Sequence, residues 1–383
     1  MRKLLPLLAF ALFADCTEKS GSEEVSIIEE PKNILKNLTY SVDTVVVNPG
    51  EEIINLKYGL IISSLSPDHQ KLYKLDGRTI QLQEINLDKL ALTASYPFEN
   101  EGPNGVGSFG SHLTSLGDER FLFSGPHKIG KFSKTGELSQ DFDYSIDKLL
   151  GGKKSIGNNL SQFAFVDEKQ MGFFLETNYS DPVFNLVTIN FKEENSKVID
   201  LPEMDVTHDF RVVLENNGNK SSWKQSVTVQ AIKSKVYITT EVSSGLYRYD
   251  PVLDSLEYIT FPLTLTATEK TRKIKNEVFS AEERKEQTSL IDSEVRFNEL
   301  LWDDNSNQFF RFSSILIPSN SEEPSNKSEV FLSAFDSYLN LIGEKKLEEL
   351  FTVPENAFFK DGKLWSYVNV EDELGFAVFT FNF

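Results

Sequence analysis

AFFKDGKLWSYVNV, residues 357–370, is the stretch that decides the fold class of this 383-residue chain. Two runs rich in aromatic and β-branched residues flank Lys360-Asp361-Gly362. An Asp-Gly pair tolerates the positive φ that a tight hairpin turn requires. A third run of the same kind, Phe376 to Phe383, follows closely. The end of the chain therefore predicts consecutive antiparallel strands.

The same unit of strand, turn, strand and longer loop recurs along the chain. Turns of this kind lie at Asp76-Gly77 and at Ser243-Ser244-Gly245, between runs that favour strands. We count about six units at a spacing of roughly 40–60 residues, the period of four-stranded propeller blades. The chain contains 30 Phe and 12 Tyr but only 3 Met, a composition that favours sheets. We expect an all-β, six-bladed β-propeller over residues 37–383.

The run from Leu38 to Asn48 is rich in β-formers but lies outside the six units. We expect this strand to pair with the C-terminal strands and to close the ring. The opposing model is a second, independent domain that starts near Pro202.

One segment, about 264–298, interrupts the strand pattern. Ser280 and Glu283 have the spacing of a capping box and precede helix-forming residues, so we expect a helical insertion. Lys270, Arg272, Lys273 and Lys275 form a basic cluster there. A solvated loop is one interpretation of this cluster, and a docking patch for an anionic partner is the other.

The first residues have the pattern of an export signal. Arg2 and Lys3 precede an apolar run from Leu4 to Phe13, which is shorter than the roughly 20 residues of a membrane span. The run ends near Cys16, the only cysteine in the chain. We expect residues 1–15 to be a signal peptide, Cys16 to be lipidated and residues 16–36 to form a flexible tether. The alternative is an ordinary cleaved signal with an incidental thiol, because Asp15 replaces the small residue expected before a lipidated cysteine.

The charge of the chain excludes one class of partner. With 58 acidic and 39 basic side chains the net charge is −19. Such a field repels phosphate backbones, so we expect no nucleic-acid partner.

Three parts of the sequence carry a resemblance to a known family. They are Tyr40 to Val45, the Gly-Pro turn of residues 101–107, and residues 297–304 followed by Phe309 to Phe312. Together with the signal sequence they are similar to an uncharacterised family of Gram-negative envelope lipoproteins with six-bladed propellers. The resemblance implies a propeller fold and an envelope location, at the outer membrane, and it implies no activity.

Signals for catalysis or metal binding are weak. The four histidines, His69, His112, His127 and His208, have no metal-ligand spacing, and no nucleophile elbow is present. Residues 105–110 match the letters of a dinucleotide loop but lack the strand-to-helix context. We expect no cofactor and no metal.

The candidate ligand-binding residues are Arg311, Trp302 and Asp303. Arg311 lies between Phe310 and Phe312 in an otherwise apolar strand, where its side chain could face the channel and bind an anion. The run from Asp303 to Asn307 is better explained as an Asx turn than as a calcium loop.

Three functions remain open from the sequence. The first is a lipid-anchored, non-catalytic propeller that binds a protein or glycan in the cell envelope. The second is an envelope hydrolase or lyase that acts on glycans or peptides at the channel mouth. The third is a structural subunit of an envelope complex.

Overall fold

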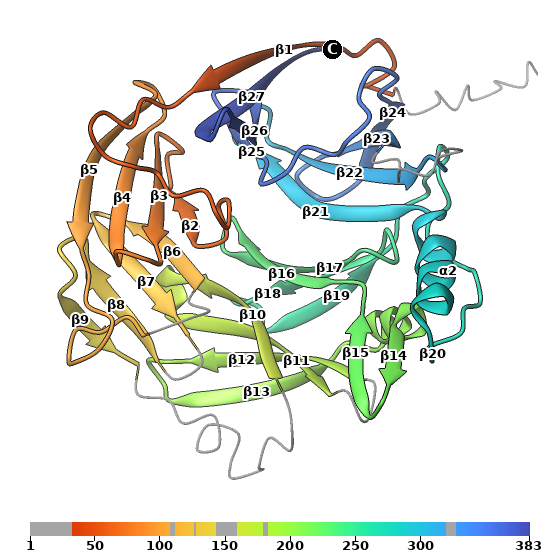
Figure 1. Cartoon of the computed structure of the whole chain (residues 1–383), viewed down its shortest axis with the longest axis horizontal. Helices are drawn as coiled ribbons and strands as arrows, with labels where there is room; N and C mark the ends of the chain where they lie inside the picture. Colours follow the sequence, from red (N-terminus) through yellow and green to blue (C-terminus); the bar gives the residue numbers. More distant parts are fainter. Residues whose placement is uncertain (1–32, 108–111, 126–127, 143–158, 179–182, 319–326) are drawn as a thin grey trace, which may run out of the picture. The chain divides into compact units, whose positions relative to one another are not determined.

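The protein is described as a computed structural model that covers residues 33–107, 112–125, 128–142, 159–178, 183–318 and 327–383 (Figure 1). Within these ranges the strands form six four-stranded antiparallel sheets and one three-stranded sheet. The expected signal peptide, Cys16 and most of the expected tether lie outside the described residues. Among the residues covered, no helix is both long and apolar enough to span a membrane.

The first three four-stranded sheets follow one another in chain order. The first contains β2 (Ser63–Leu65), β3 (Lys71–Asp76), β4 (Gln81–Asn86) and β5 (Ala91–Pro97). The second contains β6 (His112–Gly117), β7 (Arg120–Ser124), β8 (Ile129–Ser133) and β9 (Leu138–Asp141). The third contains β10 (Asn159–Val166), β11 (Met171–Asn178), β12 (Val183–Asn190) and β13 (Asn195–Asp200).

The other three sheets complete the series. The fourth contains β16 (Val227–Ile232), β17 (Lys235–Thr240), β18 (Leu246–Asp250) and β19 (Ser255–Ile259). The fifth contains β21 (Arg296–Asp303), β22 (Gln308–Leu316), β23 (Ser328–Phe335) and β24 (Leu341–Lys346). The sixth contains β25 (Phe358–Lys360), β26 (Lys363–Val370), β27 (Glu373–Asn382) and β1 (Thr39–Val46).

The expected pairing of the first strand with the end of the chain is confirmed. β1 is antiparallel to β27, in a register that runs from Thr39 opposite Asn382 to Val46 opposite Gly375. The sixth sheet is thus built from both ends of the described chain. This pairing leaves β1 at the outer edge of that sheet and β25 at its inner edge.

Apolar side chains fill the space between successive sheets. One buried cluster joins β3 and β4 to β7 and β8 through Tyr73 and Phe121, whose ring centroids are 4.6 Å apart. Equivalent clusters join each later pair of neighbours. The last cluster joins the sixth sheet to the first through Phe376 and Ile85. Each four-stranded sheet therefore packs against two others, and the fold is all-β and propeller-like.

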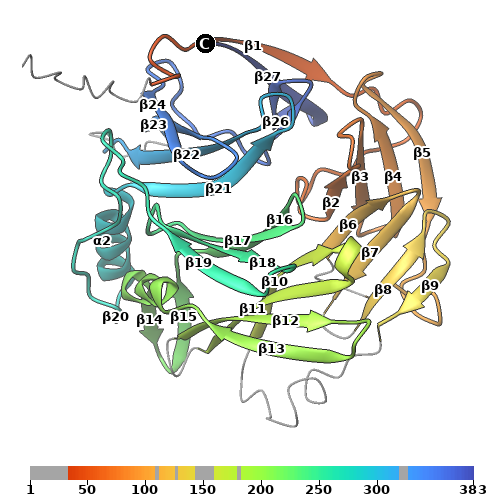
Figure 2. The same cartoon turned by 180° about the vertical axis from the view of Figure 1, so that it is seen from behind.

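The first strand of each sheet lies toward the centre of this arrangement. β2, β6, β10, β16 and β21 lie inside the other strands of their sheets in both views (Figures 1 and 2). The two middle strands of each sheet carry most of the buried apolar side chains, as in β3 and β4 or β7 and β8, whereas outermost strands such as β9 and β13 are largely exposed.

The expected helix forms within the segment that interrupts the strand pattern. α2 (Ala281–Asp292) begins at Ser280, whose hydroxyl accepts from the Glu283 backbone N–H at 3.1 Å. Ile291 of α2 packs with Phe210 and Val212, beside the three-stranded sheet. That sheet contains β14 (Val212–Asn216), β15 (Asn219–Trp223) and β20 (Glu277–Val278). Two 3₁₀ helices, η1 (Asp167–Lys169) and η2 (Pro202–Phe210), complete the described elements.

The expected tether, residues 16–36, was given too late an end, because residues 33–36 belong to the folded body. Residues 33–36 form a turn against the fifth sheet, and Leu35 is fully buried. The Asn33 amide donates to the carbonyl of Glu344 at 2.9 Å, and its oxygen accepts from the N–H of Glu344 at 3.1 Å. The approach is close because Gly343 has no side chain; a Cβ there would lie 2.7 Å from Asn33 Oδ1 and 2.9 Å from Leu35.

Candidate functional site

A large cavity lies among the innermost strands. Its volume is about 610 Å³, within the usual range of ligand pockets. Its walls come from β10, β16 and β21, from the ends of β17, β22 and β23, and from the segment 352–357. The polar side chains in these walls that are best able to bind a ligand are those of Gln162, Thr228, Glu241, Arg296, Asn298, Glu299 and Glu355.

Two β-bulges place side chains in this cavity. In β10 the register with β11 shifts between Ser161 and Phe163, and Gln162 has a left-handed φ of 52°. In β21 the register with β22 shifts between Phe297 and Leu300. A bulge turns side chains away from the regular alternation of a strand. Gln162 on one strand and Glu299 on the other therefore reach the same cavity.

Glu299 is the carboxyl with the most altered environment in the cavity. Glu299 remains exposed to the cavity, but the protein atoms around it partly desolvate its carboxyl, which raises the pKa above the ordinary value, and the nearby carboxylate of Glu241 raises it further. A hydrogen bond from Thr228 and the charge of Arg311 act in the opposite direction. Because its pKa is raised, the Glu299 carboxyl holds its proton to a higher pH than an ordinary glutamate, so it can either donate to a ligand or accept from it.

Glu241 is held by groups on two sheets. It forms an ion pair with Arg296, and its second oxygen accepts from the Ser226 backbone N–H at 3.1 Å. This arrangement fixes a charged pair at the cavity wall beside Glu299. The side-chain oxygen of Asn298 is buried and has no hydrogen-bond partner among the described residues. A buried amide oxygen without a donor is a place where a ligand or water can be accommodated.

A smaller cavity of about 120 Å³ adjoins the first and shares Gln162 and Ser226 with it. His208, Arg211 and Lys224 line this smaller cavity. Burial lowers the pKa of His208, and the charges of Arg211 and Lys224 lower it further. The ring of His208 stacks on Phe184 at 4.6 Å. The combined site therefore has an acidic part and a basic part.

Arg311 does not line the large cavity. It is almost fully buried, and it donates from Nε to the Asn298 carbonyl at 2.6 Å. Its other two nitrogens donate to the carbonyls of Ser244 at 2.6 Å and Thr240 at 3.0 Å. Burial lowers its pKa to about 9, which leaves the guanidinium protonated at neutral pH. In the structure Arg311 joins the fourth and fifth sheets, and its hydrogen bond to the Asn298 carbonyl holds the bulge of β21 in place.

Trp302 and Asp303 lie at the turn between β21 and β22, away from the large cavity. The indole N–H of Trp302 donates to Asp304 at 2.9 Å, and its ring contacts Phe309. Asp303 accepts from the backbone N–H groups of Asn305 and Ser306, as expected for an Asx turn. The structure thus separates Trp302 and Asp303 from Arg311 and from the cavity.

The glycine-rich turn and the histidines that the sequence analysis considered are not brought together in one site. Gly105 lies in the turn between β5 and β6, where a Cβ would be 2.7 Å from the backbone of Glu101; residues 108–111 lie outside the described part. His69 contacts the Phe359 carbonyl at 2.6 Å, and His127 is not described. No group of three or more His, Cys, Asp or Glu side chains with metal-binding geometry occurs in the described ranges.

Two of the four basic side chains of residues 270–275 bind groups within the protein, and Arg272 and Lys273 are exposed. Lys270 is buried, and its ammonium donates to the Ile291 carbonyl at the end of α2 at 2.9 Å. Lys275 forms an ion pair with Glu283 at 2.9 Å. These contacts give Lys270 and Lys275 a structural role, which leaves two exposed basic side chains in a solvated loop.

The sequence contains one feature that points to this site, but it was not used to predict the site residues. Asn298-Glu299 places two adjacent polar residues between Phe297 and Leu300, which breaks the alternation expected of a strand. A break of this kind is typical of a bulge. Gln162 gave no comparable signal.

The sheets, their packing and the central cavity define the class: an all-β, propeller-like protein with a polar site among its innermost strands. The chain belongs to the family described as Domain of unknown function (DUF4221), whose model matches residues 31–346.

The solved structure of a family member supports the fold, and two further solved structures are similar at lower TM-scores. A DUF4221 family member from Bacteroides vulgatus is 14% identical, with a TM-score of 0.60 over 90% of this chain and 98% of that one. A putative exported protein from Bacteroides fragilis is 8% identical, with a TM-score of 0.44 over 90% and 96%. The β-propeller domain of Swd1 from Myceliophthora is 7% identical, with a TM-score of 0.38 over 83% and 82%. No curated protein matches the chain.

Proposed function

We propose that this chain is a lipid-anchored cell-envelope protein that binds a glycan, without catalysis, in the cavity among its innermost strands. In this proposal the six four-stranded sheets are the blades of a closed six-bladed β-propeller. The observation that carries the binding role is the 610 Å³ cavity itself.

The chemistry of the cavity fits a ligand with many hydroxyl groups. Gln162, Asn298 and the carboxylates of Glu241 and Glu299 offer acceptors, and Thr228 and Arg296 offer donors. Phe297 and Phe312 add apolar surface to the same walls. Sugars present both hydroxyl edges and apolar faces, so this mixture is complementary to them.

A glycan array probed with the labelled full chain tests the binding role. We expect specific signals for a subset of oligosaccharides, with a loss of about tenfold or more for Glu299→Gln, because one strong acceptor becomes a weaker amide. Glu282→Gln, an exposed change on α2, is the matched control. Binding that is equal in both variants places the ligand elsewhere, and an array without specific signals contradicts the glycan class.

The anchor is proposed from the apolar run that precedes Cys16. We expect the wild-type chain to incorporate a labelled fatty acid in an envelope-bearing bacterium and to fractionate with membranes. Cys16→Ala should lose the label and appear in the soluble fraction. A wild-type chain that takes up no label would make the anchor wrong while leaving the cavity untouched.

The second candidate function is a hydrolase or lyase that acts on glycans or peptides. The observation that favours it is the raised pKa of Glu299 beside the carboxylate of Glu241, because paired carboxyls with different environments can divide acid and base roles. Incubation with the oligosaccharides that bind, followed by mass spectrometry, separates the two functions. Cleavage products that disappear in Glu299→Gln while binding persists would establish the enzyme.

A further inference from the structure

A second cavity, far from the first in sequence, contains an unusual lysine. It has a volume of about 230 Å³ and lies between β3 and the segment 55–62. Lys74 lines it and is only 5% exposed. Tyr58, Ile61, Ile62 and Leu75 give it apolar and aromatic walls, and the side chains of Asn55 and Asp76 also line it.

Lys74 differs from every other buried lysine in the described residues. Lys131 donates to Asp167 at 2.7 Å, Lys270 donates to a helix carbonyl, and Lys360 forms ion pairs with Asp88 and Asp361. The ammonium of Lys74 has no hydrogen bond or ion pair in the part of the chain that the structure describes. Among the buried lysines of the described residues, Lys74 is therefore the one whose ammonium lacks a hydrogen-bond or ion-pair partner.

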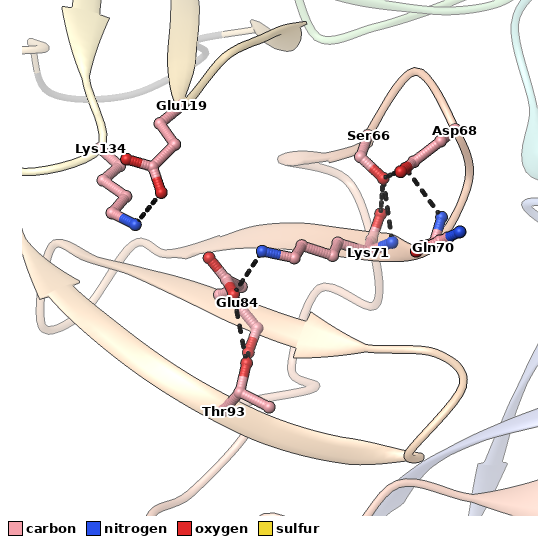
Figure 3. A network of polar contacts seen from close by, with 8 residues as sticks. All are labelled: Ser66, Asp68, Gln70, Lys71, Glu84, Thr93, Glu119 and Lys134. Atoms are coloured by element: carbon pink, nitrogen blue, oxygen red, sulfur yellow. Dashed lines mark hydrogen bonds and ion pairs between the residues drawn. The ribbon is translucent and has the colours of Figure 1, made fainter.

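Lys71, on the same strand, gives a direct comparison. Its ammonium points to Glu84, at 2.8 Å, while Lys134 points to Glu119 in the same region (Figure 3). Residues 71 and 74 lie on opposite faces of β3, because successive side chains alternate. The face that carries Lys71 supplies a carboxylate partner, and the face that carries Lys74 does not.

The polar neighbours of Lys74 compensate its charge only in part, and none of them forms an ion pair or hydrogen bond with its ammonium among the described residues. Asp76, on the same face, accepts from the Arg78 N–H at 3.0 Å, from Thr79 at 2.9 Å and from Asn55 at 3.2 Å. Gln83, opposite Lys74 in the sheet, donates to the Ile53 carbonyl, and its oxygen has no partner among the described residues. The Lys74 side chain is largely buried, but its ammonium reaches the cavity and has no direct partner, so it is available to pair with an added anion.

We propose that this cavity binds a small carboxylate with a compact apolar body, whose head group pairs with Lys74. The apolar walls exclude a fully hydrated inorganic anion and fit an aliphatic or aromatic body. Tyr58 and Ile61 are 67% and 76% exposed, so the ligand can enter between them from solvent. Burial lowers the pKa of Lys74 in the unliganded protein, and the charge of Asp76 offsets this only in part, in agreement with an ammonium that lacks a paired counter-charge.

The test uses isobutyrate and benzoate as probes and isobutyramide and benzamide as neutral isosteres. Thermal unfolding of the full chain is followed as each probe is titrated, because a ligand that binds only the folded state raises the Tm. We expect the carboxylates to raise the Tm in a saturable manner and the amides to have little effect. Lys74→Met should weaken carboxylate binding by about tenfold or more, as expected for loss of a charged partner.

Lys89→Met, an exposed lysine change on the same sheet, is the matched control and should leave binding unchanged. Lys74→Met should also raise the Tm without ligand, because it removes a largely buried charge that has no direct partner. Equal effects of acids and amides, or carboxylate binding that survives Lys74→Met, would overturn the proposal. If Lys74→Met fails to fold, the comparison of acids with amides on the wild-type chain still decides it. Neither result bears on the proposed glycan binding in the central cavity.

Discussion

Gln162 of β10 and Glu299 of β21 lie in bulges on two different sheets and line one cavity. Regular strands in these positions would direct alternate side chains into the packing between sheets. The bulges instead direct polar groups toward the centre. The site therefore depends on local departures from sheet geometry, supported from behind by Arg311.

The first prediction concerns the backbone at Gln162. A residue with φ of 52° is strained unless it is glycine, and a β-branched residue is strained most. We expect Gln162→Val to lower the free energy of unfolding by about 1–3 kcal/mol and Gln162→Gly to change it by less than about 1 kcal/mol. Chemical denaturation measures both. Equal destabilisation by both substitutions would show that the side chain, and not the backbone conformation, is decisive.

The second prediction concerns Arg311. Arg311→Met removes the donors of three backbone carbonyls and should lower the free energy of unfolding by about 2–4 kcal/mol. The control is Arg248→Met, which breaks a partly exposed pair with Glu257 and should cost less than about 1 kcal/mol. Urea unfolding curves provide the comparison. A change at Arg311 no larger than the change at Arg248 would contradict its structural role.

The third prediction concerns pH and Lys270. Burial lowers the pKa of this ammonium to about 8 from its ordinary value of 10.5, while Glu294 and Asp292 oppose and Arg296 assists that shift. Between these two values the unfolded chain binds more protons at this position than the folded chain does. Stability contributed by this residue should therefore rise as the pH rises from about 8 to 10.5, by about 1–3 kcal/mol.

The measurement for Lys270 is the difference in unfolding free energy between the wild type and Lys270→Met at several pH values. Taking the difference removes the titration of all groups common to both chains. A difference that is constant from pH 8 to 10.5 would show that the folded pKa is not lowered.

The fourth prediction concerns the turn at residues 33–36. Leu35 is fully buried against the fifth sheet, so Leu35→Ala should cost about 2–5 kcal/mol. Val42→Ala on β1 is the control; Val42 is 45% exposed and should cost less than about 1 kcal/mol. If the two substitutions have the same effect in thermal denaturation, the turn is not part of the folded body.

Much of the fold was predictable because hairpin turns have a local chemistry. Asp76-Gly77 and Asp361-Gly362 marked turns that the structure contains, and the strand from Leu38 was correctly paired with the C-terminus. The helix after Ser280 was predicted from its capping residues. These features depend on short-range backbone preferences, which a sequence displays directly.

Other features depend on long-range contacts that a sequence does not display. The polar surroundings of Leu35 resembled a tether, although a distant glycine, Gly343, provides its docking site. The hairpin of β14 and β15 was missed because β15 is polar and neither strand alternates, despite the Asn217-Gly218 turn. The cavity residues were also missed, because they come together only through contacts between sheets. Arg311 attracted attention as a lone charge in an apolar strand, but its acceptors are carbonyls of a neighbouring sheet.

The most direct test of the binding role is a crystal structure of the chain, without its first 32 residues, with an oligosaccharide selected on the array. We predict that the sugar lies in the central cavity within hydrogen-bonding distance of Glu299 and Gln162. We also predict that crystals of Glu299→Gln soaked under the same conditions show reduced occupancy. A sugar bound on the outer strands, with the central cavity filled only by water, would contradict the proposed binding role.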